Sequence, residues 1–391
     1  MSRDPVRDRA RLGLRSGPPP TVARWLRLDL GLFIGAAGLS VVGVVLVWSA
    51  TRVESGAAMA AKQALAVVVG MVAAAVITRL DVRLVRAAAP LVYLAALGGL
   101  VAVLSPLGRQ VNGSRSWIGL PGGFSLQPSE LMKVALVIGL AMLLAERADR
   151  GERQRHRDIA VAWVIAGLPI VLVLAQPDLG SALVLVAMSA AVIAAAGGPL
   201  VWTLAVAAAG VATVVAAFTT PLLSPHQQDR LRAFLDPSLD PQGIGYQTGQ
   251  VRIAIASGGV DGQGLFAGRQ TQAGVIPYQE SDFIFSVAAE ELGFVGAAGV
   301  VVLLAFLVLR ALVVARRADT FGRLVTTGIG VWLAVQAIEN IGMNLGVLPV
   351  TGLPLPFLSY GGTSMVAVWV AVGIVGNVAS ETADRRALSR R

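Results

Sequence analysis

Residues 29–50 read DLGLFIGAAGLSVVGVVLVWSA and contain a single charged side chain, Asp29. An apolar helix of about 20 residues crosses the hydrocarbon core of a bilayer. Nine more apolar runs of similar length follow, at 59–78, 88–106, 128–145, 159–176, 179–196, 200–221, 283–309, 324–345 and 363–380. The sequence therefore predicts an all-α polytopic membrane protein with about ten transmembrane helices.

The composition of the whole chain agrees with this fold class. Of its 391 residues, 55% are hydrophobic and 14% are charged, whereas soluble domains carry about 25% charged residues. A soluble globular enzyme, a disordered chain and a fibrous repeat are therefore excluded. The chain has no cysteine and two histidines, which rules out a disulfide framework and leaves little room for a histidine-based metal site.

The placement of the basic residues predicts the topology. The net charge is +9, and 23 of the 32 basic residues lie in the two termini and in three connectors on one side of the expected bundle. Since basic residues are retained in the cytoplasm, both termini are expected there. We expect a disordered arginine-rich tail at 1–27, a membrane domain at 28–380 and a basic tail at 381–391. Because the arginines border the membrane and aromatics are 6% of the chain, nucleic-acid binding has no support.

Two extracytoplasmic segments stand out. Residues 222–282 form a long loop between spans 7 and 8, and long ordered loops are usually functional. Its residues Ile244–Ser257 suit a helix lying along the membrane surface. Residues 346–362, GVLPVTGLPLPFLSYGG, are apolar but too rich in glycine and proline for a regular helix. Such backbone survives at membrane depth where protein or a wet cavity satisfies its polar groups. We expect a re-entrant loop that lines an outward-facing cavity, with a hydrophobic surface loop as the alternative.

A charged pair opens the fourth span. Ionisable residues inside membrane helices are costly and are candidates for function. Glu130 and Lys133 are three residues apart, which places them on one helical face. One interpretation is an internal ion pair that allows both residues to be buried. The other is that Lys133 faces an anionic group of a substrate while Glu130 orients it, and both interpretations can hold together.

Asp282 lies where the long outer loop ends and the eighth span begins. One interpretation is an N-cap, in which Ser281 or Asp282 satisfies the first helical N–H groups. The other is a catalytic base. Carboxylates at Glu280 and Glu290, together with apolar neighbours such as Phe283, would raise the pKa of Asp282 toward that of a working base.

Other polar residues have weaker signals. Asp178, between spans 5 and 6, suits a helix N-cap better than a functional role. Arg230 and Arg252, in the long loop, suit phosphate oxygens or a solvated loop face. The common soluble nucleotide-binding and hydrolase motifs are absent from the sequence.

Several short strings together resemble one protein family, the SEDS (shape, elongation, division and sporulation) family, along the whole membrane domain. They are SRSWI at 114–118, FSLQPSELMK at 124–133, QPDLG at 176–180, Arg230 with FLDP at 234–237 and GYQ at 245–247, DFIF at 282–285, EELG at 290–293, LPVTG at 348–352 and SYGG at 359–362. Within the family, GQGLF at 262–266 and NIGM at 340–343 resemble the RodA branch more than the FtsW branch.

This resemblance implies a peptidoglycan glycosyltransferase that polymerises lipid II, an undecaprenyl-pyrophosphate-linked disaccharide-peptide, on the outer face of the bacterial cytoplasmic membrane. It implies a class B penicillin-binding protein as partner and, for the RodA branch, a role in cell elongation and shape. The family's essential aspartate falls on Asp282, which would act as the base of an inverting transfer. The matched motifs suggest substrate contacts at Arg115, Trp117, Glu130, Lys133, Gln176, Asp178, Arg230, Arg252, Glu290, Ser359 and Tyr360. No cofactor is assigned, and a divalent cation (Mg or Mn) stays an open alternative.

The sequence departs from the family at one informative place. Where the family usually has His-Thr before the aspartate, this chain has Glu280-Ser281, which keeps a hydroxyl but exchanges a residue that can be cationic for an anion. Three alternatives stay open: a flippase or transporter of lipid-linked precursors, a non-catalytic scaffold for the penicillin-binding protein, and an FtsW-like division polymerase. The uniformly apolar cytoplasmic halves of the spans disfavour a transporter, because a transport path needs polar residues.

Overall fold

A computed structural model describes residues 29–111, 113–199, 243–389 and the positions 201, 202, 204–206, 208, 210 and 234. The expected tail at 1–27, Arg230 and most of the expected span at 200–221 lie outside the described residues.

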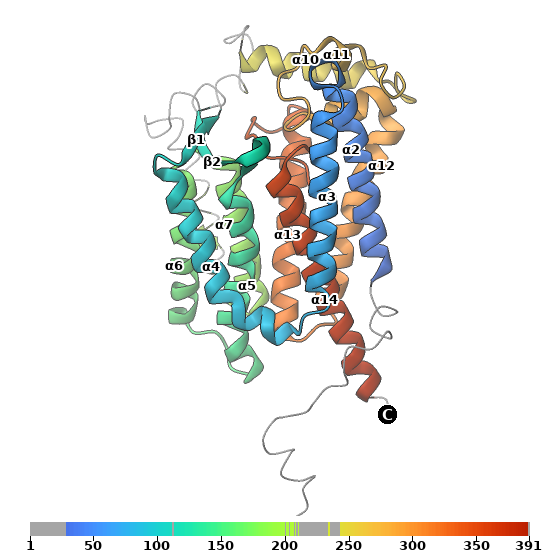
Figure 1. Cartoon of the computed structure of the whole chain (residues 1–391). Helices are drawn as coiled ribbons and strands as arrows, with labels where there is room; N and C mark the ends of the chain where they lie inside the picture. The colour runs from blue at the N-terminus through green and yellow to red at the C-terminus, as the bar shows by residue number, and fades with distance from the viewer. Residues whose placement is uncertain are drawn as a thin grey trace, which may run out of the picture.

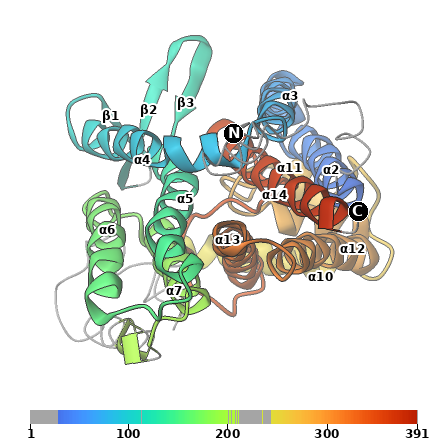
Figure 2. The ribbon, with the colours of Figure 1, turned by 90° about the horizontal axis from the view of Figure 1, so that it is seen from below.

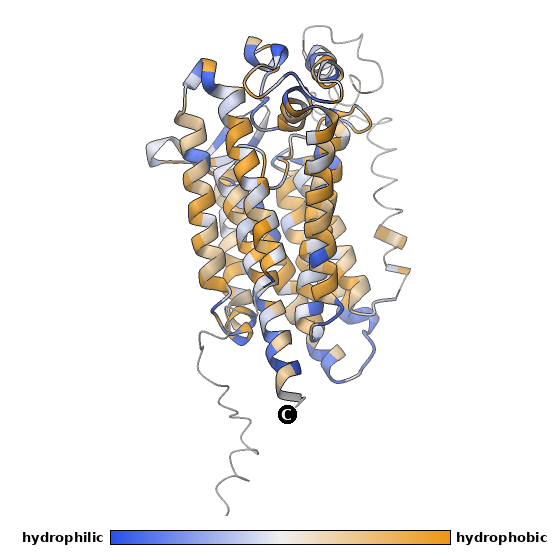
Figure 3. Cartoon of the chain, turned by 90° about the vertical axis from the view of Figure 1, so that its right-hand side faces the viewer, coloured by the Kyte–Doolittle hydropathy of each residue, from blue (hydrophilic) through white to orange (hydrophobic). Residues whose placement is uncertain are grey.

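The described chain is a bundle of long apolar helices. Eight are long and apolar enough to cross a membrane: α2 (Leu30–Ser55), α3 (Ala58–Ile77), α4 (Val82–Leu104), α5 (Pro128–Asp149), α6 (His156–Leu174), α12 (Ile284–Ala315), α13 (Thr320–Asn344) and α14 (Gly362–Ser389). A ninth apolar helix, α7 (Leu179–Ala195), is shorter. Figure 3 shows apolar residues along the length of the bundle and polar residues gathered at its two ends. The predicted all-α polytopic fold is confirmed.

Aspartates mark the beginnings of several helices. Asp29 accepts a hydrogen bond from the backbone N–H of Leu32, at 3.2 Å, and Asp319 accepts one from Gly322 N–H, at 2.9 Å. Such side chains satisfy N–H groups that have no partner inside the helix. Asp178 does the same for α7 by accepting from Ser181 N–H at 2.9 Å. The cap predicted for Asp178 is therefore confirmed.

A small antiparallel sheet lies at the end of the bundle opposite the C-terminus (Figure 1). Its strands are β1 (Gly108–Val111), β2 (Ser114–Leu120) and β3 (Phe124–Leu126). Two short helices, α10 (Ile244–Ser257) and α11 (Arg269–Ala273), lie at the same end. The helix expected at Ile244–Ser257 is thus present and packs against α12. The sequence analysis did not predict the sheet, because its strands are short and lie between two apolar spans.

Helix α13 lies in the middle of the bundle (Figure 2). It contacts α5, α7 and α12, while α14 packs along α3 (Figure 2). Trp332 of α13 and Trp369 of α14 are fully buried. Helix α2 comes close to the segment before α14, because a Cβ on Gly43 would lie 2.5 Å from the carbonyl oxygen of Phe357.

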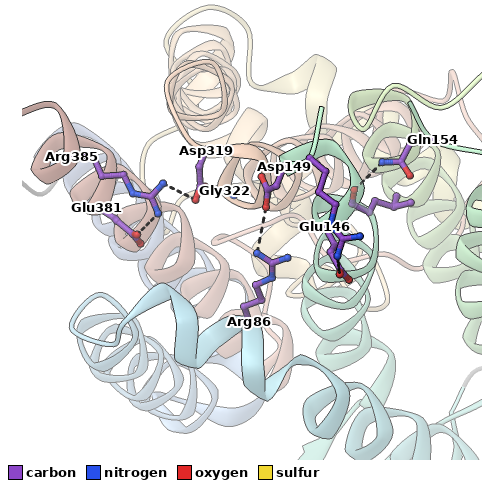
Figure 4. Close-up of polar contacts among 10 residues, drawn as sticks. Arg86, Glu146, Asp149, Gln154, Asp319, Gly322, Glu381 and Arg385 are labelled. Carbon is purple, nitrogen blue, oxygen red and sulfur yellow. Dashed lines mark hydrogen bonds and ion pairs between the residues drawn. The ribbon is translucent and has the colours of Figure 1, made fainter. Parts of the chain in front are cut away.

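Ion pairs connect helices at the arginine-rich end, as Figure 4 shows. Arg86 of α4 lies 3.6 Å from Asp149 of α5. Arg385 of α14 pairs with Asp319, which precedes α13, at 3.0 Å, and with Glu381 of α14 at 2.6 Å. These arginines therefore crosslink neighbouring helices in addition to setting the charge of this end.

Candidate active site

The segment between α13 and α14 is irregular and deeply buried. Residues 346–361 contain no regular helix, yet Leu353, Leu355, Phe357 and Leu358 are at most 1% exposed. This confirms the expected irregular backbone inside the protein. The alternative of a hydrophobic surface loop is wrong.

Three consecutive backbone carbonyls around Asp282 are held by this segment and by α13. The carbonyl of Glu280 accepts a hydrogen bond from Tyr360 N–H at 2.8 Å. The carbonyl of Ser281 accepts from the Ser359 hydroxyl at 2.5 Å. The carbonyl of Asp282 accepts from the side-chain amide of Asn340 at 3.0 Å. The backbone of the half-buried Asp282 is therefore fixed at the edge of the irregular segment.

Asn344, one helical turn after Asn340, adds two contacts. Its amide nitrogen also donates to the carbonyl of Asp282, at 3.1 Å, and its amide oxygen accepts from Ser286 N–H at 3.2 Å. The first turn of α12 is thus capped from α13. The N-cap position of α12 is Phe283, which offers no side-chain hydrogen bond. The alternative in which Ser281 or Asp282 is the N-cap is therefore wrong.

Glu130 and Lys133 form a buried ion pair. Lys133 Nζ lies 2.6 Å from Glu130 Oε1, and both side chains are 0% exposed. Lys133 also donates to Gln336 Oε1 at 2.9 Å and lies 5.3 Å from the centre of the Trp332 ring. A buried charge without a partner is strongly unfavourable, so each member stabilises the other. The internal ion pair predicted as one alternative is present.

Helix α13 links this ion pair to the region of Asp282. Gln336 accepts from Lys133 and donates to the carbonyl of Pro354 at 2.8 Å. Asn340, four residues later, donates to the carbonyl of Leu353 at 2.7 Å as well as to Asp282. Two adjacent peptide groups of the irregular segment thus connect the two predicted functional groups.

The sheet and the α6–α7 connection contribute other predicted residues. Arg115 is exposed on β2 and donates to the carbonyl of Gly108 at 3.1 Å, while Trp117 is half-buried on the same strand. Gln176 is buried and donates to the carbonyl of Leu100 at 3.2 Å. Asp178 Oδ2 accepts from Gln127, which precedes α5, at 3.4 Å.

Glu290 has a different environment from the one expected. Its carboxylate accepts from the N–H groups of Gln270 and Thr271, at 2.7 and 3.0 Å, and from the Thr271 hydroxyl at 2.7 Å. These contacts hold the first turn of α11 against α12. The structure therefore engages the Glu290 carboxylate with α11. Arg252 of α10 is exposed and donates to the carbonyl of Gly346 at 3.4 Å.

Glu280 lies two residues before Asp282 and is half-buried. Burial raises the pKa of Glu280, and the nearby carboxylate of Glu54 raises it further. Burial also raises the pKa of Tyr360, with the charge of Glu280 as the second cause.

Several residues of this network were missed by the sequence analysis. Gln336, Asn340 and Asn344 recur every four residues, which puts them on one face of an apolar helix. This four-residue spacing of amide side chains in an apolar helix could have indicated a buried polar face. Glu339, 3% exposed on α13, lies near Thr351, Asp178 and Lys133. Among the described residues, no group of three or more His, Asp or Glu is arranged to hold a metal ion.

The fold and these contacts define a polytopic membrane protein with a buried polar network at one end. Residues 25–384 match a family described as cell cycle protein, which comprises FtsW, RodA and SpoVE, and the chain belongs to this family. Because the chain belongs to this family and contains several long apolar helices, it is an integral inner-membrane protein.

Individual relatives agree. A probable peptidoglycan glycosyltransferase FtsW of Trichlorobacter lovleyi is 37% identical, with 91% of this chain and 94% of the relative covered. The peptidoglycan glycosyltransferase MrdB of Escherichia coli K12 is 35% identical, with 90% and 94% covered. The predicted enzyme class, a glycosyltransferase, is therefore confirmed.

Solved structures share the fold. A chain from a study of how a peptidoglycan synthase complex coordinates polymerization and crosslinking superposes with a TM-score of 0.77 at 33% identity, covering 92% of this chain and 99% of that one. The rod shape determining protein RodA of Thermus thermophilus gives a TM-score of 0.66 at 30% identity, covering 91% and 97%.

Proposed function

We propose that this protein polymerises lipid II into glycan strands, with Asp282 as the catalytic base. The observation that carries the proposal is the immobilised backbone of residues 280–282, in which each carbonyl accepts a hydrogen bond from α13 or the irregular segment. A base must be held in one geometry relative to the group it deprotonates. Asp282 meets this requirement while its side chain stays half-buried at the edge of the network.

The reaction balances with a single base. Asp282 takes the proton of the acceptor sugar hydroxyl as that oxygen attacks the anomeric carbon of the donor. The bond from that carbon to the pyrophosphate oxygen breaks, and the lipid pyrophosphate leaves with the electron pair. Since the donor is α-linked and the product β-linked, the transfer inverts the anomeric centre. Such general-base help is worth about 10²–10⁴-fold in rate.

The departing pyrophosphate needs cations at headgroup depth. Arg115 and Arg252 are exposed at the same end as Asp282, and guanidinium groups match phosphate oxygens. Lys133 is 0% exposed and already paired, so we assign it the positioning of Gln336 and the irregular segment in this conformation. Arg230 is proposed as a further phosphate contact from its motif alone.

We place this end on the extracytoplasmic face, because the arginine clusters lie at the opposite end. Glycan strands become cell wall only after crosslinking, so a class B penicillin-binding protein is the proposed partner. The structural relative from a peptidoglycan synthase complex supports that pairing. The motifs at 262–266 and 340–343 favour a RodA-like role in elongation over an FtsW-like role in division.

A reconstitution experiment tests this function. Purified protein in proteoliposomes receives fluorescent lipid II, with and without a class B penicillin-binding protein. We expect glycan ladders on a gel. Movement of the labelled lipid between leaflets without polymer would instead indicate a flippase, and neither product under either condition would indicate a scaffold.

A further inference from the structure

Glu339 of α13 is a buried carboxyl that the proposed reaction does not use. It is 3% exposed, and within the described part of the chain neither of its oxygens accepts a hydrogen bond of ordinary length. The Thr351 side chain of the irregular segment lies near enough to interact with it. Since an ionised carboxylate needs several donors when it leaves water, this site suits the neutral form of the carboxyl better than the anion.

The charges around Glu339 favour the neutral form as well. Asp178 and Lys133 act on it electrostatically, and Glu130 is the ion-pair partner of Lys133, at 2.6 Å. Three anions around one cation would leave an excess of negative charge inside the bundle. Glu130 accepts from Lys133, and Asp178 accepts from Ser181 N–H at 2.9 Å. Glu339 has the fewest donors of the three, so it is the carboxyl on which a proton removes the excess at least cost.

The other ionisable groups on elements packed against α13 are engaged with other residues or lie at the arginine-rich end. They are Glu290 and Glu291 of α12, which bond to α11 and to Ser49 of α2; Arg252 of α10, which donates to the carbonyl of Gly346; Asp282, which meets α13 through its carbonyl; and Glu381, Asp384, Arg385 and Arg386 in the last turns of α14. Asp178 and Lys133 are therefore the charged groups that decide the state of Glu339.

Lys133 connects Glu339 to the hydrogen bonds that hold the proposed active site. It donates to Gln336 Oε1 at 2.9 Å, and Gln336 donates to the carbonyl of Pro354 at 2.8 Å. An ionised Glu339 would compete for the Lys133 ammonium group and weaken its contact with Gln336. Because Gln336 holds the irregular segment, loss of the proton would loosen the segment that fixes the backbone of residues 280–282.

We propose that Glu339 is a positioning residue that works in its protonated form, so that a proton bound inside the bundle keeps the proposed active site assembled. The effect on rate rests on the proposed polymerase function, whereas the bound proton is a property of the fold alone. Glu339→Gln mimics the protonated acid at every pH. Glu291→Gln is the matched control, because Glu291 is 1% exposed on α12 and accepts from the Ser49 hydroxyl at 2.6 Å.

Infrared difference spectroscopy of the purified full-length protein at about pH 6 tests the proton directly. The spectrum of wild type minus that of Glu339→Gln should contain the C=O stretch of a protonated carboxylic acid, which shifts when H₂O is replaced by D₂O. Absence of this band would overturn the proposal. The measurement needs no substrate, so it separates a failure of this proposal from a failure of the proposed function. Thermal unfolding verifies that the variants are folded.

Polymerisation of lipid II from about pH 6 to about pH 9 tests the positioning role. The kcat of wild type should fall at least about tenfold over this range as Glu339 ionises, with KM changing less than about threefold, while Glu339→Gln should lose less than about threefold of its kcat. Glu291→Gln should keep the fall shown by wild type. Equal pH profiles of wild type and Glu339→Gln, or a folded Glu339→Gln variant that is inactive at every pH, would overturn this role.

Discussion

The side-chain amide of Asn340 donates to the carbonyl of Asp282 at 3.0 Å and to the carbonyl of Leu353 at 2.7 Å. One buried residue of α13 thereby joins the peptide of the proposed base to the irregular segment. Asn340 is 0% exposed, so its amide is fully enclosed by the protein. Its loss removes this donor from the Leu353 carbonyl and leaves the Asp282 carbonyl with the hydrogen bond from Asn344 alone, which loosens the backbone that carries Asp282.

Asn340→Ala should lower kcat about 10–100-fold while changing KM less than about threefold, since small misplacements of a catalytic group have effects of this size. The measurement is steady-state polymerisation of lipid II by purified protein. Asn377→Ala is the matched control, because Asn377 is also buried and donates to two carbonyls, those of Ile77 and Leu80, at 2.6 and 2.7 Å. If both variants lost kcat equally, the role of Asn340 would be structural only.

The ion pair of Glu130 and Lys133 makes a prediction about stability. Lys133→Met leaves Glu130 as an unpaired buried charge and should destabilise the protein by about 3–5 kcal/mol. Replacing both, with Glu130→Gln and Lys133→Met, should recover most of that loss, because no buried charge remains. The check is a double-mutant cycle by thermal unfolding in detergent. Additive losses would argue against a coupled pair.

At Gly43, α2 packs closely against the irregular segment, and this contact gives a prediction about stability. Gly43→Ala should destabilise the protein by about 1–3 kcal/mol, since its Cβ would lie 2.5 Å from the Phe357 carbonyl oxygen. Gly38→Ala, on the same helix, would place its Cβ 3.8 Å from the nearest atom and should be neutral or slightly stabilising. Thermal unfolding of the two variants measures this difference. A Gly43→Ala variant as stable as wild type would mean that the contact is absent.

Glu280 predicts a pH-dependent effect on stability. Its pKa is raised above 4.5 by burial and then by Glu54, so the folded state holds a proton that the unfolded state releases. This contribution to stability is present at pH 4.5 and is lost as the pH rises through the raised value. Glu280→Gln keeps the neutral form at every pH.

The difference in Tm between Glu280→Gln and wild type should therefore grow from about pH 4.5 to about pH 8. Unfolding curves at three pH values measure this difference. Tyr360 faces Glu280 and should stay neutral over that range, because its own pKa is raised from 10.0. A constant difference in Tm would contradict the raised pKa.

The features that could be predicted from the sequence are those that depend on hydrophobic periodicity and composition. Apolar runs predicted the membrane helices, and glycine and proline at 346–362 predicted an irregular segment. Side-chain networks depend on which helices become neighbours. A single sequence does not show which helices pack together. The contacts of Gln336 with Lys133, 203 residues apart, and of Asn340 with Asp282, 58 apart, are therefore visible only in the structure.

Two further contacts could not be predicted from the sequence near them. Glu290 was expected close to Asp282 from its position along the same helix, and the contacts of its carboxylate with the N–H groups of α11 were not foreseen. The N-cap of α12 was expected at Ser281 or Asp282, and the helix begins later because Asn344 supplies the capping acceptor from another helix. In both cases a residue distant in sequence replaces the local partner.

Polymerisation by Asp282→Asn tests the central claim most directly. Asparagine keeps the size and the backbone contacts of Asp282 but cannot accept the proton, so the variant should unfold like wild type and make glycan about 10²–10⁴-fold more slowly. Asp261→Asn, at an exposed position between α10 and α11, serves as the control and should keep full activity. Glycan synthesis by folded Asp282→Asn at the wild-type rate would contradict the assignment of the base.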